Sequence, residues 1–282
     1  MTPILGGLLA ACLFATATLC SSRSSRLIPP SSVLAWVMLV GLVVTVPTVG
    51  LAAAPVGVGA AEVGWLVVAG SGNVAGLLLA YSALRLGKVS IVAPVLSTEG
   101  AVAAVISVAT GESIETASAC LLLLIVVGVV LAAAAPDAIV TAPGSRLRPF
   151  VLAALAAGAF GTSLYATGHV SASLPLPWVI LPARLIGVVG VTLPLLAAGR
   201  LRLTRRAAPL VVAGGLCEVL GFGAYALGAR YGLAVAAVLA SQFAGIAAIS
   251  AFAFFRERLT RLQLSGVAIV AVGVALLSAV RV

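Results

Sequence analysis

The chain has 282 residues, of which 62% are hydrophobic and only 8% are charged, with a formal net charge of +9. Its mean hydropathy of +1.27 lies far above that of soluble globular domains, which excludes that class and predicts an integral membrane protein. The basic excess does not indicate a nucleic-acid partner, because the Lys and Arg residues lie mostly between apolar segments.

Ten apolar runs follow one another, each close to the roughly 20 residues that a helix needs to cross a bilayer core of about 30 Å. We place them at 3–20, 32–51, 62–84, 88–109, 117–135, 149–170, 177–198, 207–229, 233–255 and 260–280. The first run lacks the basic start of a signal peptide, so we expect it to be retained as a spanning helix. The runs are continuously apolar, unlike the alternating strands of membrane barrels, and therefore predict an all-α membrane protein with ten transmembrane helices.

Basic residues concentrate in every second loop. Thirteen lie in the odd-numbered loops: Arg23, Arg26, Arg85, Lys88, Arg146, Arg148, Arg200, Arg202, Arg205, Arg206, Arg256, Arg258 and Arg261. Because positive loops remain in the cytoplasm, this pattern predicts that both termini are outside, in a cell (plasma or inner) membrane.

The second half of the chain repeats the first. Moving residues 73–131 forward by 145 positions superposes identical pairs: Gly76 on Gly221, Arg85 on Arg230, Gly87 on Gly232, Gly100 on Gly245, Ala103 on Ala248, Glu112 on Glu257, Gly128 on Gly273 and Leu131 on Leu276. Phe14 and Phe160 match at an offset of 146. We predict two five-helix repeats, 1–135 and 149–282, with a linker at 136–148. Five is an odd number, so the second repeat is inverted, as in many secondary transporters.

Two carboxylates lie in the middle of apolar runs. Glu99 is eleven residues into the fourth run (from 88 to 99), which at about 1.5 Å per residue places it near the membrane midplane. Glu218 lies equally deep in the eighth run, and the repeat pairs it with Asn73 in the third. A charge at a helix centre is costly, so such residues usually face a bundle interior or a cavity. Each also fits a structural role, as a hydrogen bond between helices.

Four more polar residues join these as candidates for substrate binding or ion coupling. Ser241 and Gln242 lie near the position that the repeat pairs with Glu99, and Tyr225 lies two turns after Glu218. Arg184, in the seventh run, fits either a counter-ion or an arginine that extends to the interface. Pro94 removes a backbone hydrogen bond and predicts that the fourth helix bends beside Glu99.

The sequence contains no signature of an enzyme, a metal site or a cofactor site. It lacks HExxH, G-x-S-x-G and acidic clusters, and its four cysteines (Cys12, Cys20, Cys120 and Cys217) have no metal-ligand spacing. We therefore expect no catalytic residues, no metal and no cofactor.

The segments YSALRLGKVSIVAP, LSTEG and GES, with their counterparts YALGARYGLAVAAVLASQF and FRERL, resemble the drug/metabolite transporter superfamily, in particular EamA-type ten-helix carriers. The resemblance implies inverted five-helix repeats around a central cavity and transport of small metabolites. It implies that Glu99 matches an acid of the fourth helix and Arg184 an arginine early in the seventh. Glu112 and Glu257 match a "GE" turn, which we interpret as a helix start. Two residues depart from the family pattern: Gly100 stands where a proline often follows the acid, and Arg256 replaces a glycine.

The sequence thus predicts a secondary active transporter of a small organic metabolite or drug, first of all an exporter, working by alternating access and open to proton coupling through Glu99 or Glu218. Such coupling needs a carboxylate that titrates near physiological pH, which desolvation can provide. A passive channel or a divalent-cation carrier of the same fold is the alternative. The expected partners are the lipid bilayer and a small-molecule substrate, without nucleic acid, and the chain is expected to be a monomer or a homodimer.

Overall fold

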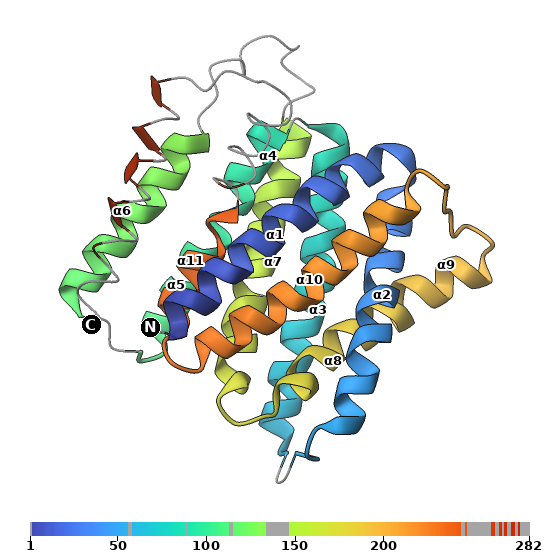
Figure 1. Ribbon diagram of the computed structural model, residues 1–282, viewed down its shortest axis with the longest axis horizontal. Coiled ribbons are helices and arrows are strands. Elements are labelled where there is room, and N and C mark those ends of the chain that lie inside the picture. The colour runs from blue at the N-terminus through green and yellow to red at the C-terminus, as the bar shows by residue number, and fades with distance from the viewer. Residues whose placement is uncertain are drawn as a thin grey trace.

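The computed structural model describes residues 2–55, 58–87, 89–112, 115–133 and 147–243, with a few further positions between 246 and 276. This part of the chain is all-helical (Figure 1). The helices are α1 (Thr2–Leu27), α2 (Pro30–Leu51), α3 (Ala60–Leu86), α4 (Val89–Leu96), α5 (Glu99–Ala109), α6 (Thr116–Ala133), α7 (Leu147–Ser171), α8 (Leu176–Gly187), η2 (Val188–Thr192), α9 (Leu193–Ala197), α10 (Ala208–Ala229) and α11 (Leu233–Ala240).

Among the described residues, six helical stretches are long and apolar enough to cross a membrane: 2–27, 30–51, 60–86, 148–171, 176–197 and 208–229. Large apolar side chains such as Leu51, Val105 and Val189 are exposed. Apolar surface on this scale is stable against lipid rather than water. The prediction of an all-α, multi-pass membrane protein is confirmed. About half of the ninth predicted span, more than half of the last and nearly all of the predicted linker lie outside the described residues.

The fourth predicted span is two helices rather than one. α4 ends at Leu96 and α5 begins at Glu99, with a turn at residues 97 and 98. The Thr98 hydroxyl donates to the carbonyl of Val95 at 2.7 Å, and the Thr98 amide donates to the same residue at 3.2 Å. Pro94, three residues before the turn, contributes no backbone donor. The predicted bend is therefore a full break in the helix, immediately before Glu99.

The ninth predicted span has a similar break. α11 ends at Ala240, and residues 241 and 242 form a turn. The Ser241 hydroxyl donates to the carbonyl of Val238 at 2.8 Å, as Thr98 does to Val95. No proline precedes this turn, so the shared cause is a hydroxyl side chain that bonds a carbonyl three residues back and competes with the helical ladder.

Glycines let the helices of the two halves approach closely. A Cβ on Gly6 of α1 would lie 2.7 Å from Cα of Gly228 on α10, and one on Gly72 of α3 would lie 2.9 Å from the Ala159 carbonyl of α7. Figure 1 shows α1 and α10 crossing the molecule together, and α3 is packed on α7 in the same way. Small residues at helix contacts are typical of membrane bundles, where close packing replaces the hydrophobic effect.

Candidate functional site

A cavity of about 50 Å³ lies between the two halves of the chain and is partly open to the outside. Its walls come from α1, α3, α4 and α5 of the first half and from α7, α10 and the turn after α11 of the second. The lining residues are Phe14, Ala17, Thr18, Ser21, Leu77, Ala80, Tyr81, Leu84, Leu96, Glu99, Phe160, Leu164, Glu218, Phe222 and Phe243. Two carboxylates thus face a space that is otherwise mostly apolar.

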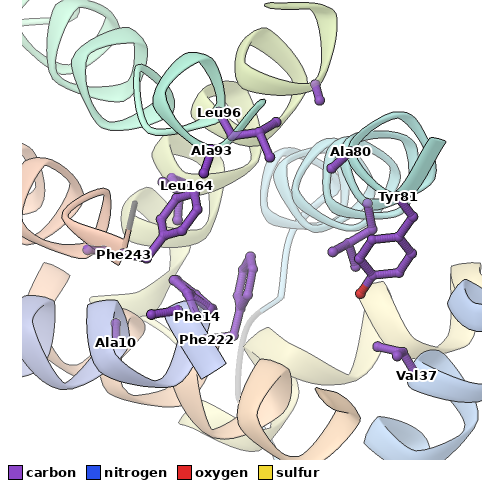
Figure 2. Close-up of a cluster of buried hydrophobic side chains, with 14 of the residues drawn as sticks. Ala10, Phe14, Val37, Ala80, Tyr81, Ala93, Leu96, Leu164, Phe222 and Phe243 are labelled. Carbon is purple, nitrogen blue, oxygen red and sulfur yellow. The ribbon is translucent and has the colours of Figure 1, made fainter. Parts of the chain in front are cut away.

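Aromatic rings form much of the cavity wall. Figure 2 shows Phe14, Phe222 and Phe243 on one side and Tyr81 on the other. The rings of Phe14 and Phe222 meet edge to face, with centroids 5.9 Å apart. This arrangement is favourable for aromatic pairs and fixes the ring orientations. Because Phe14 comes from α1 and Phe222 from α10, the pair also joins the two halves.

Glu99 is the first residue of α5 and is only 5% exposed. Its backbone is held on two sides. A Cβ on Gly161 of α7 would lie 2.8 Å from the Glu99 carbonyl, and one on Gly100 would lie 2.5 Å from the hydroxyl of Ser241. Within the described part of the chain, no residue forms a hydrogen bond or ion pair with the Glu99 carboxylate. The helix start places this buried acid at the cavity, with no partner among the residues that the structure describes.

Glu218, in the middle of α10, is also buried but has partners. The Asn73 side-chain amide of α3 donates to its Oε1 at 3.1 Å. Nη2 of Arg184 in α8 lies 3.8 Å from the same oxygen. Opposite charges and a donor compensate the cost of burying this carboxylate. The two acids of the cavity therefore differ, since described residues compensate the charge of Glu218 and none of them pairs with Glu99.

Arg184 is fully buried and sits behind the cavity wall rather than in it. Its Nη1 donates to the sulfur of Met38 at 3.6 Å, and its guanidinium carbon lies 5.8 Å from the centre of the Phe222 ring. Its Nε and Nη2 have no hydrogen-bond partner among the described residues. The Glu218 carboxylate is thus the main compensation for this charge.

The other three predicted site residues lie outside the cavity lining. The Tyr225 hydroxyl donates to the carbonyl of Leu164 at 2.6 Å, which joins α10 to α7. Ser241 and the Gln242 amide both donate to the carbonyl of Val238 at the end of α11. They shape the elements around the cavity. Sequence reasoning missed the aromatic wall, although the repeated pair Phe14 and Phe160 was a signal for it.

Glu112 occupies a helix N-terminus, but of a different helix from the one we predicted. The "GE" turn was expected to start the following helix, α6. Instead its carboxylate accepts from the backbone amide of Ala234 in the first turn of α11 at 3.3 Å, and it also bonds the hydroxyl of Ser107. Free backbone amides at a helix start favour an acid. The acid of the first half therefore stabilises a helix of the second.

Comparison with known proteins finds a similar fold and a family match for residues 1–134. The chain is similar to a protein of known crystal structure over 99% of its own length and 96% of the other chain, with 18% identity and a TM-score of 0.76. At that identity the likeness shows the fold alone. A comparison with curated proteins finds no match. The model of the EamA-like transporter family matches residues 1–134. The match to residues 1–134 is consistent with the drug/metabolite transporter superfamily.

Proposed function

We propose that the chain is a secondary active transporter of a small organic solute, which it moves by alternating access through the cavity. The observation that carries this proposal is the cavity's position, since both halves of the chain supply its walls. A site between two structural repeats changes its exposure when the repeats rock against each other. The family of residues 1–134 supports transport as the activity.

The two halves are, in this proposal, the inverted five-helix repeats 1–135 and 149–282, joined by the linker 136–148. Reciprocal contacts support it. Gly76 packs on Phe160, and its counterpart Gly221 packs on Phe14, the counterpart of Phe160. Such exchanged contacts are the mark of two units related by a two-fold axis.

A second reciprocal set lies between α2 and α8. At an offset of 146, Met38 corresponds to Arg184 and Gly41 to Gly187. A Cβ on Gly41 would lie 2.7 Å from Cδ of Arg184, and one on Gly187 would meet the side chain of Met38. An inverted repeat predicts this exchange, whereas two halves of unrelated topology have no reason to produce it.

In this proposal, Glu99 couples transport to the proton gradient. The other predicted site residues form its surroundings: Glu218, Asn73, Arg184, Tyr225, Ser241 and Gln242. A buried carboxylate without a protein partner can exchange a proton for another ligand, which is the chemistry that coupling to a proton gradient needs. Because Arg184 and Asn73 already compensate Glu218, that acid is less suited to the exchange. We place the protein in the plasma or inner membrane, as a monomer or homodimer.

The test is flux in proteoliposomes. Purified protein is first screened by thermal shift against amino acids, nucleosides and cationic drugs, because a ligand that binds only the folded state raises the melting temperature. Each compound that does so is then followed into vesicles with and without a pH gradient. We expect saturable, gradient-driven transport in the wild type and its loss in Glu99→Gln. The control variant Glu62→Gln changes the acid at the start of α3, where a glutamine can replace its bond to Gly59. Unitary currents across a planar bilayer, in place of saturable flux, would contradict the carrier and indicate a channel.

A further inference from the structure

We infer that the loop between α9 and α10, residues 198–207, binds the headgroups of anionic phospholipids in the adjoining leaflet of the membrane. Its side chains include four closely spaced arginines: Arg200, Arg202, Arg205 and Arg206. All four are exposed, and none of their guanidinium groups forms a hydrogen bond or ion pair with another described residue. This surface lies outside the cavity, so the inference does not depend on the proposed transport activity.

The backbone of this loop is held in place, although the loop is neither helix nor strand. The Trp36 indole of α2 donates to the carbonyl of Arg202 at 3.0 Å, and the Arg202 amide donates to the hydroxyl of Ser32 at 3.2 Å. At the end of the loop, the Ala207 amide donates to the hydroxyl of Thr204 at 3.2 Å, and Ala207 is fully buried. A loop fixed in this way loses little conformational entropy when it binds a ligand. The arginines therefore stand on a preorganised support.

The charges at this end of the bundle favour an anion. Four further exposed arginines lie here, in the last turns of α1 and α3 and the first turn of α7: Arg23, Arg26, Arg85 and Arg148. The described acids outside the cavity belong to the opposite end, before or in α3 and between α5 and α6: Glu62, Glu112 and Glu115. No described acid therefore competes for the arginines of the loop. The positive-inside rule explains the sign of these charges, but not the gathering of four on one anchored loop.

Apolar side chains beside the arginines indicate a lipid rather than a soluble anion. Leu203 of the loop is exposed, as are Leu193 and Leu196 of α9, where the membrane-spanning stretch 176–197 ends. Figure 1 shows α9 and the loop after it at the edge of the view. A phospholipid satisfies both features, since its acyl chains cover the leucines and its phosphate accepts from the guanidinium groups. A free phosphate ion or a nucleic acid would leave the leucines uncovered.

A net negative headgroup fits better than a zwitterionic one. In phosphatidylcholine the ammonium group of the lipid cancels the charge of its own phosphate, whereas phosphatidylglycerol keeps that charge. Each basic residue near an anionic leaflet strengthens the attraction several-fold. Four arginines without a described counter-charge thus favour the anionic lipid.

Quenching of Trp36 fluorescence by brominated phospholipids tests the inference, because bromine on an acyl chain quenches only a nearby indole. The changes Trp65→Phe and Trp178→Phe leave Trp36, beside the loop, as the single tryptophan. The protein is reconstituted into phosphatidylcholine vesicles in which a minor fraction of the lipid is brominated phosphatidylglycerol or, for comparison, brominated phosphatidylcholine. We expect phosphatidylglycerol to be preferred at Trp36 by about tenfold, and the preference to fall as salt is raised.

Two double variants that lose the same charge show whether the loop is the site. Arg202→Gln with Arg205→Gln should lower the preference to about twofold or less. Arg23→Gln with Arg26→Gln, in α1 at the same end of the bundle, should leave it within about twofold of its original value. Equal losses in the two double variants, no preference in the parent protein, or displacement of the lipid by inorganic phosphate overturns the inference.

Native mass spectrometry provides the same comparison with all three tryptophans in place, should the single-tryptophan protein fail to fold. Delipidated protein in detergent is titrated with phosphatidylglycerol or phosphatidylcholine, and the bound lipids are counted from the mass. We expect phosphatidylglycerol adducts to be depleted about fivefold or more in the loop double variant and not in the α1 double variant. Equal numbers of adducts in the two double variants would contradict the site. Neither measurement involves a transported solute, so the inference and the proposed function can fail separately.

Discussion

Asn73 and Glu218 lie 145 residues apart in sequence, and the Asn73 amide donates to the Glu218 carboxylate at 3.1 Å. The offset of 145 is also the offset at which the two halves of the chain align. Residues at equivalent positions of two units touch each other only where the relating axis passes. The pair therefore marks the centre of the proposed two-fold arrangement, and the difference between an amide and an acid at this place makes the two halves unequal.

Replacing Asn73 by alanine removes the only hydrogen bond that a described side chain donates to Glu218. We expect Asn73→Ala to lower the free energy of unfolding by about 1–3 kcal/mol, because a buried acceptor is left without its donor. The measurement is titration of SDS into mixed micelles. The matched control is Ser71→Ala in the same helix, where an exposed hydroxyl bonds a carbonyl of its own turn. A control effect as large as that of Asn73→Ala would contradict this account.

Replacing Arg184 by methionine, the residue at the equivalent position 38, leaves Glu218 without its counter-charge. We expect a loss of about 3 kcal/mol or more, as is typical when one partner of a buried ion pair is removed. The double variant Arg184→Met with Glu218→Gln should be more stable than Arg184→Met alone, since both charges of this pair are then removed together. Strictly additive effects in this double-mutant cycle would show that the two charges do not interact.

At Gly100, helices α5 and α11 approach each other too closely to leave room for a side chain. A Cβ there would lie 2.6 Å from the Ala237 carbonyl oxygen, a backbone atom that cannot rotate away. Gly100→Ala should therefore destabilise the protein by about 1–3 kcal/mol and reduce transport, because both helices border the cavity. Gly158→Ala, in the middle of α7 with no atom near the new methyl group, should be neutral or slightly stabilising. Thermal unfolding in detergent compares the two, and equal melting temperatures would rule out the contact.

Glu112 links the halves at the start of α11 through the Ala234 amide. Glu112→Ala should cost about 1 kcal/mol, the usual contribution of an acid that satisfies a helix N-terminus. Glu115→Ala, which removes an exposed acid three residues later, is the control. Hydrogen exchange of the α11 amides localises the effect, with faster exchange expected only in Glu112→Ala. Unchanged exchange in that variant would contradict the capping role.

Hydropathy predicted the long membrane-spanning helices well. Apolar runs of membrane length define α1, α2, α3, α7 and α10 to within several residues, because lipid leaves few alternatives to a helix. The break after α11 was not predicted, since no proline marks it and a serine inside a helix is compatible with either outcome.

Prediction of the candidate site was less complete. Glu99 and Glu218 stand out because a carboxylate is rare at membrane depth. Phe222 and Phe243 do not, because a phenylalanine in an apolar run faces lipid as readily as a cavity, and only the packing of distant helices decides between them. The ion pair of Arg184 with Glu218 depends in the same way on the contact between α8 and α10.

Access to the cavity from both sides of the membrane tests the central claim most directly. Ala80 is buried within the protein and lines the cavity. Ala80→Cys is placed in a chain whose four cysteines are replaced, and sealed vesicles are treated with an impermeant thiol reagent from the outside or from the inside. Ala166→Cys, fully buried in α7 and outside the lining, is the control. Alternating access predicts that the cysteine at position 80 reacts from either side while the control does not, and reaction from one side alone would contradict it.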